Sequence, residues 1–309
     1  MIIFILFTTI LCYRPIPQNQ YIILSTSKFW FNYRQAINSL LIYQQLKEWR
    51  INDDQISLMI PEDTACNRKN SVPGVACAYD GQREPNLHKK VNWDFKRNDV
   101  NIKYWIDVMR NKYNRYTPQS RRLTLSKEQK LLMFMNGHGG DGYTKMQDTT
   151  YLLDFEMEKI TKEMEFLELY SEAFLISDSC GAITLFETVK AKNMILLGSS
   201  SLGEKAYSHG RCSLLQIPKT DKFSLTTHNW LRKELDKRPN LTLLDQINQY
   251  DYSYHKANSK LIINMEKKEA KDIKAADFWK PKQPTFNYFI LRNDQDILAQ
   301  QEFLELMKA

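Results

Sequence analysis

The sequence predicts an α/β protein in which helices cover both faces of a mostly parallel sheet. Apolar runs of about five residues, typical of strands that are buried on both faces, alternate with amphipathic stretches of about two to four helical turns. This alternation covers roughly the first two hundred residues and weakens after residue 215. At 309 residues the chain is long enough for a full hydrophobic core, and it contains no internal repeat.

The expected elements follow from the period of the apolar positions. Strands are expected at residues 21–25, 56–60, 131–135, 173–177 and 193–197. Helices are expected at residues 33–49, 102–112, 156–170 and 182–190, with a further helical pattern at 228–250. Residues 61–98 indicate a long irregular insertion, and the pattern is ambiguous over the last forty residues. Consecutive strands joined by helices favour a doubly wound sheet.

The composition gives no indication of a nucleic-acid partner. The chain has 43 Lys and Arg against 36 Asp and Glu, a formal charge of +7, which describes a mildly basic surface. The first twelve residues, MIIFILFTTILC, form an apolar run that is too short to span a bilayer. They favour a cleaved secretory signal, although the basic segment that usually precedes such a run is missing; a buried first strand or a truncated gene remain alternatives.

Five cysteines are too few for a disulfide scaffold, and their number is odd. Cys66 and Cys77 lie in a stretch rich in Pro, Gly and Asn, ACNRKNSVPGVAC. They could close a short loop, pair with another chain or stay unpaired.

A histidine and a cysteine follow two of the predicted strands. His138 lies in NGHGGDG after the strand at 131–135, and Cys180 lies in SDSCGA after the strand at 173–177. The carboxyl ends of parallel strands meet at one edge of the sheet, where ligands bind. Flanking glycines allow a substrate to approach the backbone, and an imidazole near a thiol at a helix N-terminus can accept its proton. The pair is therefore a candidate for thiolate catalysis.

Each residue also has a structural interpretation. A histidine after a strand is often a hydrogen-bonding residue, and a cysteine there is often a small core residue. A phosphate-binding loop is disfavoured, because no Lys-Ser/Thr follows the glycines.

Three motifs carry a resemblance to a known family: MNGHGGDGYTKMQD, ISDSCGAITLFE and GSSSLGEKAYSH. In this order and spacing they resemble the legumain-like cysteine peptidases. Within that group they resemble the family of catalytic subunits of glycosylphosphatidylinositol (GPI) transamidases. The upstream stretches SKFWFNYRQAINSLLIYQQLKEW and ISLMIPEDTACN are similar to that family in the corresponding order. The resemblance covers roughly residues 20–215.

The resemblance implies roles for individual residues. Cys180 matches the nucleophile, His138 the general base, and Asn32 the position that orients the histidine. Gly139 and Cys180 match the donors of the oxyanion hole, which backbone N–H groups can form. From the sequence alone, an Asn before a helix is more typical of an N-cap.

Further positions match binding functions of the family. Ser199 and Ser200 match the groove beside the scissile residue, although a polar turn is the simpler interpretation. Cys66 matches a cysteine that can form a disulfide with a partner subunit.

The resemblance also implies a structural calcium site, while the chemistry itself requires no cofactor. The matching ligands are Asp53, the Ile56 carbonyl, Asn92 and Asp94, with Asn92 standing where the family has a glutamate. An amide oxygen is a hard ligand without charge. Solvated loop carboxylates are the alternative.

As a whole, the resemblance implies a caspase-like three-layer sandwich and a multisubunit GPI transamidase on the lumenal side of the endoplasmic reticulum. The substrates implied are C-terminal signal peptides of proproteins and a GPI glycolipid. Since the sequence has no transmembrane segment, membrane association is expected through partner subunits. The domain organisation is then a signal peptide and lead-in at 1–19, a catalytic domain at 20–250 and an extension at 251–309. A free-standing legumain-like endopeptidase and a catalytically silent scaffold are the alternatives.

Overall fold

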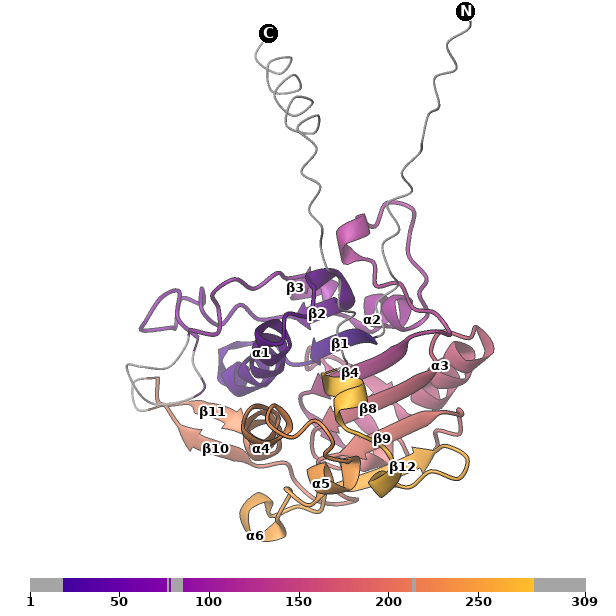
Figure 1. Ribbon diagram of the computed structural model, residues 1–309. Helices are drawn as coiled ribbons and strands as arrows, with labels where there is room; N and C mark the ends of the chain where they lie inside the picture. The colour runs from indigo at the N-terminus through magenta and orange to yellow at the C-terminus, as the bar shows by residue number, and fades with distance from the viewer. Residues whose placement is uncertain (1–18, 77, 79–85, 213–214, 281–309) are drawn as a thin grey trace, which may run out of the picture.

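A seven-stranded sheet forms the centre of the molecule, and helices lie on both of its faces (Figure 1). The computed structural model describes residues 19–76, 78, 86–212 and 215–280. The sheet has the order β12-β9-β8-β4-β1-β2-β3, and every pair is parallel except β12 with β9. The strands are β1 (Asn19–Ser25), β2 (Ile56–Ile60), β3 (Phe95–Lys96), β4 (Lys130–Asn136), β8 (Glu172–Asp178), β9 (Met194–Gly198) and β12 (Lys260–Asn264). The predicted three-layer α/β architecture is confirmed.

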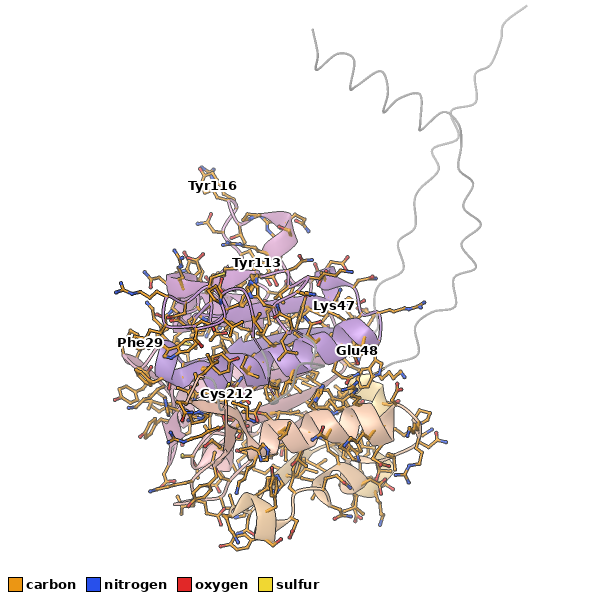
Figure 2. All side chains as sticks on the ribbon, turned by 90° about the vertical axis from the view of Figure 1, so that its left-hand side faces the viewer. Phe29, Lys47, Glu48, Tyr113, Tyr116 and Cys212 are labelled. Atoms are coloured by element: carbon orange, nitrogen blue, oxygen red, sulfur yellow. The ribbon has the colours of Figure 1, made fainter. Side chains whose placement is uncertain are left out.

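The helices are divided between the two faces of the sheet. One face carries α1 (Tyr33–Glu48) and α4 (Lys222–Trp230), and the other carries α2 (Ile102–Met109) and α3 (Asp154–Phe166). Seen from the side, α1 runs between Phe29 and Glu48, and Tyr116 projects on a loop above it (Figure 2). The shorter helices are α5 (Leu243–Ile247), α6 (Tyr252–His255) and α7 (Ala276–Trp279).

Two small sheets lie beside the central one. A three-stranded antiparallel sheet directly follows the β4 loop, and a two-stranded one precedes α4. Their strands are β5 (Gly139–Gly140), β6 (Tyr143–Met146), β7 (Thr150–Leu153), β10 (Ser208–Arg211) and β11 (Pro218–Asp221).

The central strands are apolar throughout because both of their faces are buried. In β1, Tyr21 and Ile23 belong to the core beneath α1, whereas Ile22 and Leu24 belong to the core beneath α2 and α3. All four side chains have no exposed surface. Successive side chains of a strand point to opposite faces, so each strand serves two cores at once.

The α-helix predicted at residues 182–190 is wrong. The segment forms a single 3-10 turn, η5 (Ala182–Leu185). The Thr184 hydroxyl donates to the Gly181 carbonyl at 2.6 Å, which occupies an acceptor that an α-helix would use. The Ile183 N–H donates outside the turn, to the Ser200 carbonyl at 3.1 Å. These bonds hold the backbone in the tighter conformation.

The chain after residue 250 continues the same packed unit. β12 forms the antiparallel edge of the central sheet, and the rings of Phe278 and Trp279 pack edge-on against Phe174 of β8. The boundary expected at residue 250 therefore does not separate two bodies among the described residues. The expected signal segment lies outside the described residues, apart from Asn19 at the start of β1. In the parts that are described, no helix combines the length and apolarity needed to cross a bilayer.

Replacing Trp279 by Ala is expected to lower the free energy of unfolding by about 3 to 5 kcal/mol. The Trp279 side chain is fully buried, and its Nε1 donates to Gln246 Oε1 at 3.0 Å, so the substitution leaves both a cavity and an unpaired acceptor. Urea unfolding followed by circular dichroism measures the change. Tyr252→Ala, at a side chain that is 55% exposed, is the control and should change stability by less than about 0.5 kcal/mol. A change of less than about 0.5 kcal/mol in Trp279→Ala would contradict the packing of Trp279 in the core.

Candidate active site

The loops that carry His138 and Cys180 begin at the same level of the sheet. β4 and β8 are parallel neighbours in which Asn136 lies opposite Asp178, and each of the two candidate residues follows its strand by two positions. The Gly137 N–H donates to the Asp178 carbonyl at 3.1 Å, which extends the ladder into the loop. The structure therefore places both residues at one carboxyl edge, as the sequence predicted.

Two glycines around His138 are required by close packing. A Cβ atom on Gly137 would lie 1.9 Å from Thr26 Oγ1, and one on Gly139 would lie 2.8 Å from Ser179 Oγ. Real Cβ atoms do not approach other atoms so closely. The glycines thus let the His138 loop fit between the loops that follow β1 and β8.

His138 forms its key hydrogen bond with Asn32. His138 Nε2 lies 2.8 Å from Asn32 Oδ1, and the Asn32 side chain is almost fully buried. Asn32 Nδ2 donates to the Lys28 carbonyl at 2.6 Å and to Asp148 Oδ2 at 3.1 Å, so Oδ1 is the acceptor. Nε2 therefore carries the proton, and Nδ1 is left as the basic nitrogen.

The same contacts decide between the two interpretations of Asn32. The residue occupies the N-cap position of α1, but its side chain makes no capping hydrogen bond. Instead, it binds the histidine. Its position before the helix is thus that of a cap, whereas its contacts are those of a residue that orients an imidazole.

The surroundings of His138 favour its neutral form. Burial lowers the pKa of His138 below its usual value, and the nearby Arg34 guanidinium lowers it further. The carboxylates of Asp148 and Asp221 act in the opposite direction, but the net direction is down. At neutral pH the imidazole can therefore accept a proton.

Cys180 is a free, partly exposed thiol at the edge of an open hollow of about 370 Å³. The hollow is lined by Gly140, Asp141, Tyr143, Cys180, Gly181, Gly203, Glu204 and Lys205. The helix expected to begin after Cys180 is only the four-residue turn η5, so the argument from a helix N-terminus does not apply.

Two backbone N–H groups near the candidate residues, those of Gly139 and Cys180, are not used in strand pairing within the described part of the chain. Lys145 N–H donates to the His138 carbonyl at 2.8 Å, which makes the neighbouring pair Gly139–Thr144 a non-hydrogen-bonded pair of the ladder. The Gly139 N–H thus points away from β6. The Cys180 N–H has no hydrogen-bond partner among the described residues. Binding of a negative oxygen by these two groups stays a prediction.

Ser199 and Ser200 directly follow β9, and both are buried. Ser200 Oγ donates to the Ser179 carbonyl at 2.7 Å and accepts the Ala182 N–H at 3.1 Å. Ser199 Oγ donates to the same Ser179 carbonyl at 3.3 Å. These hydroxyls hold the backbone on both sides of Cys180, and contact of either serine with a substrate stays a prediction.

The structure adds charged residues that the sequence analysis missed. Arg34 Nε donates to Asp221 Oδ1 at 2.9 Å, and Asn38 Nδ2 donates to Asp221 Oδ2 at 2.7 Å. Arg34 could have been found, because it follows Asn32 by two residues. Asp221 could not, because it lies 187 positions from Arg34 in the sequence.

Asp141 is a further missed residue. Asp141 Oδ1 accepts the Gly203 N–H at 2.9 Å, and a Cβ on Gly181 would lie 2.7 Å from the same oxygen. The carboxylate therefore joins the turn between β5 and β6 to the loop after β9, and it lies against Gly181, the residue after Cys180.

Three of the expected calcium ligands, Asp53, Asn92 and Asp94, lie close together. Asp53 accepts hydrogen bonds from the Tyr43 hydroxyl at 2.8 Å and from Asn92 Nδ2 at 2.6 Å, and Lys47 Nζ lies 3.0 Å from its Oδ1. These three donors compete with a cation for the Asp53 oxygens.

Asp94 supplies the second carboxylate of this group. Its burial, together with the charge of Asp53, raises the pKa of Asp94 to about 7, against the opposing bond from the Leu58 N–H at 2.8 Å. The Ile56 carbonyl lies at the start of β2, directly after the turn that contains Asp53. Two carboxylates that repel one another fit a divalent cation, which would relieve the repulsion.

Cys66 lies apart from these residues, in the loop after β2. Its thiol is free and exposed, and Sγ lies 4.0 Å from His88 Nε2. Cys77, its possible intrachain partner, lies outside the described residues.

Comparison with known proteins identifies relatives over most of the chain. The model of the peptidase C13 family matches residues 20–271. A "GPI-anchor transamidase" of Schizosaccharomyces pombe is 32% identical over 262 residues, which are 84% of this chain and 69% of that protein. A "Putative GPI-anchor transamidase" of Caenorhabditis elegans is 32% identical over 70% of this chain and 68% of its own length. The human "GPI-anchor transamidase" is 28% identical over 70% of this chain, and the match spans 54% of that protein.

Replacing Asn32 by Asp is expected to raise the pKa of His138. The new carboxylate would face the Nε2–H group and favour the imidazolium form, whereas burial and Arg34 hold the native pKa below its usual value. As pH falls, the variant should therefore lose its neutral base earlier than the native chain. NMR titration of the ring protons measures both pKa values.

The NMR signal of His138 is assigned with a second variant of this chain, and a third variant is the control. It has five histidines, so the signal missing in His138→Gln identifies His138. Asn240→Asp is the matched control, because Asn240 lies with Asn19 and Lys130 at the opposite edge of the sheet. A pKa of His138 that is the same in Asn32→Asp and in the native chain would contradict the assigned hydrogen bond.

Proposed function

The chain belongs to the peptidase C13 family of cysteine-dependent enzymes, and we propose that it is the catalytic subunit of a GPI transamidase. The observation that carries this proposal is the similarity to proteins named GPI-anchor transamidase in fission yeast, worm and mammals. The family match at residues 20–271 includes Asn32, His138 and Cys180. The mostly parallel sheet with flanking helices is the caspase-like fold expected for this family.

The proposed reaction begins with formation of a thioester. His138 Nδ1 accepts the Cys180 thiol proton, and the thiolate attacks the carbonyl carbon of the attachment residue in a proprotein. The carbonyl oxygen becomes negative and accepts hydrogen bonds from the N–H groups of Gly139 and Cys180. The C–N bond then breaks, His138 returns the proton to the departing amine, and the C-terminal signal peptide leaves.

The second half of the reaction resolves the thioester. The ethanolamine amine of a GPI glycolipid attacks the thioester carbonyl, and His138 Nδ1 accepts a proton from this amine. The C–S bond breaks, the new amide forms, and the proton returns to the Cys180 sulfur. Because water could attack the same carbonyl, transfer to an amine depends on its positioning and on exclusion of water.

The proposed setting is a multisubunit complex on the lumenal side of the endoplasmic reticulum. This placement is an inference from the names of the relatives and from the expected N-terminal signal. Partner subunits would provide the membrane association. Cys66 is exposed and free, as a cysteine that forms a disulfide with a partner must be before the two chains join.

Acceptor choice tests the proposed function. Lumenal membranes that lack the endogenous enzyme are supplied with this chain, a reporter with a GPI attachment signal, and hydrazine as a small amine. A reporter hydrazide is expected with the native chain and not with Cys180→Ala, because only a thioester at Cys180 can be resolved by the added amine. Mass spectrometry of the reporter C-terminus measures the product.

The control for loss of a thiol is Cys212→Ser, because Cys212 is free, buried and outside the hollow around Cys180. It should form hydrazide at the native level. Hydrolysed reporter alone would instead favour a free-standing endopeptidase of the same family. Hydrazide formation by Cys180→Ala would contradict the assignment of Cys180 as the nucleophile.

A structural calcium ion at Asp53, Ile56, Asn92 and Asp94 is part of the proposal. Binding requires Asp53 to exchange its contact with Lys47 for a contact with the ion. Calcium should then raise the melting temperature of the native chain by about 2 to 4 °C per kcal/mol of binding free energy. Asp94→Asn should abolish the rise, and Lys47→Met should enlarge it. No rise in the native chain, measured against magnesium, would exclude the site.

A further inference from the structure

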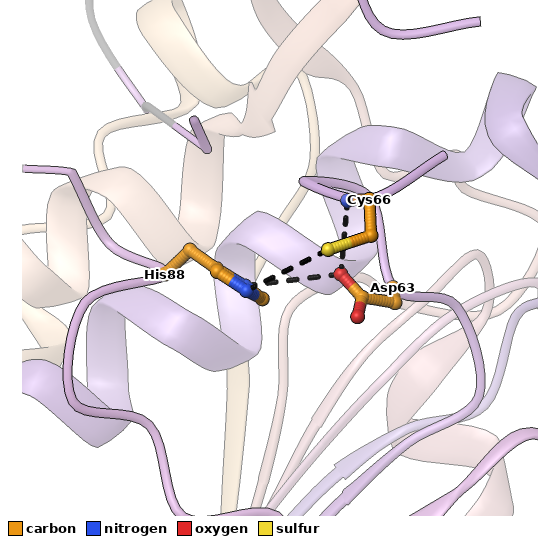
Figure 3. Close-up of side chains that lie close together, drawn as sticks. All are labelled: Asp63, Cys66 and His88. Carbon is orange, nitrogen blue, oxygen red and sulfur yellow. Dashed lines mark hydrogen bonds and ion pairs between the residues drawn. The ribbon is translucent and has the colours of Figure 1, made fainter. Parts of the chain in front are cut away.

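Three side chains with metal-binding atoms meet on the surface, and none of them is among the residues proposed for catalysis. Asp63 and Cys66 lie in the loop after β2, and His88 lies in the segment that leads to β3 (Figure 3). One ligand atom from each residue can be chosen so that all three lie within 4.8 Å of one another. Within the described ranges, this is the one such group of three His, Cys, Asp or Glu residues.

The backbone around Asp63 and Cys66 is held in place before any ion binds. Asp63 Oδ1 accepts the Cys66 N–H at 3.1 Å. Asn70 Nδ2, which is buried, donates to the carbonyls of Thr64 at 3.1 Å and Val75 at 2.9 Å. These bonds close the loop on itself, so Asp63 and Cys66 keep their spacing without a ligand.

His88 is tied to the same loop from the other side. The Leu87 N–H donates to the Ala76 carbonyl at 2.8 Å, and the Leu87 side chain is buried. Asn86 Oδ1 accepts the N–H groups of both Ala76 and His88 at 3.0 Å. The imidazole packs against Trp93 with ring centroids 5.9 Å apart. His88 therefore approaches Cys66 from an anchored backbone.

The distances are close to those of a zinc site. His88 Nε2 lies 4.0 Å from Cys66 Sγ, and His88 Nδ1 lies 3.8 Å from Asp63 Oδ1. Around a tetrahedral Zn²⁺, with bonds of about 2.0 to 2.3 Å, neighbouring ligand atoms lie about 3.5 Å apart. Only one ring nitrogen can bind the ion, so small rotations of the three side chains would complete the geometry.

We propose that Asp63, Cys66 and His88 form a binding site for a divalent transition-metal ion, of which Zn²⁺ is the best fit. One nitrogen, one thiolate and one carboxylate are ligands that Zn²⁺ takes, whereas Ca²⁺ and Mg²⁺ prefer oxygen alone. Since Cys66 is exposed, the fourth position stays open to water. On binding, the Cys66 thiol releases its proton to solvent and the sulfur bonds to the ion.

The charges around the thiol are consistent with this site. The Asp63 carboxylate raises the pKa of the Cys66 thiol, and Lys96 acts in the opposite direction without reversing the shift. Without a cation, two negative groups would meet here once the thiol ionised. A bound dication removes that repulsion.

The metal site goes beyond the proposed transamidase function. Metal binding by the Cys66 sulfur also excludes a disulfide of the same sulfur with a partner subunit. A Cys66 that is joined to a partner by a disulfide carries no thiolate, so the metal and the disulfide compete. The metal site therefore belongs to the chain with Cys66 reduced.

Cobalt titration of the full reduced chain tests the proposal. The chain carries Cys180→Ala, so that the partly exposed thiol of Cys180 cannot bind the probe. Co²⁺ is expected to bind one to one with a thiolate-to-cobalt charge-transfer band, and Zn²⁺ should displace it. Cys66→Ser should abolish the band, and His88→Gln should weaken binding by more than about tenfold.

Two controls separate the site from general effects. His209→Gln removes a histidine that binds Tyr254 and should leave cobalt binding unchanged. Circular dichroism checks that each variant is folded. The proposal is overturned if the parent chain shows no charge-transfer band, if the band survives Cys66→Ser, or if His88→Gln binds as tightly as the parent. None of these results depends on transamidase activity.

Discussion

The parallel register between β4 and β8 is the constraint on which the site depends. It places Asn136 opposite Asp178, so that His138 and Cys180 emerge at the same level although they are 42 residues apart in the sequence. β1 extends the arrangement, because Ser25 lies opposite Asn136 and leads into the loop that carries Asn32. A slip of one residue in β4 would turn its core side chains to the wrong faces. The two cores therefore fix the register, and the register fixes the positions at which His138 and Cys180 leave the sheet.

Buried polar groups beneath this edge complete the positioning. Asp178 is fully buried, and burial together with the charge of Asp221 raises its pKa. Ser224 Oγ of α4 donates to Asp178 Oδ2 at 2.5 Å, while Asp221 holds Arg34 of α1. The residue two positions before Cys180 is thus linked to the helices on one face of the sheet. Buried charges persist only where such partners exist, so this network ties α1 and α4 to the strand that carries the thiol.

The sequence predicts those features that depend on local pattern. The five predicted strands, β1, β2, β4, β8 and β9, were located to within one or two residues, because both of their faces are buried and their apolar runs are unbroken. The short edge strand β3 and the antiparallel edge strand β12 were not predicted. The prediction of an α-helix after Cys180 was wrong, because the Thr184 hydroxyl donates to the Gly181 carbonyl and so competes with the backbone hydrogen bonds of a helix. The Arg34–Asp221 pair and the contact between Cys66 and His88 were not predicted. They join residues 187 and 22 positions apart, and no periodic pattern connects such positions.

The loop after β2 is joined to the proposed catalytic edge through Glu62. Its Oε2 accepts the Phe29 N–H at 3.1 Å, and its Oε1 accepts Asn67 Nδ2 at 2.8 Å. The Phe29 carbonyl in turn accepts the Asn32 N–H at 3.0 Å. Phe29 has a φ of 76°, a value that is strained for a residue with a side chain and persists only where neighbouring contacts enforce it. Glu62 supplies such a contact. The segment that carries Cys66 therefore helps to hold the backbone that presents Asn32 to His138.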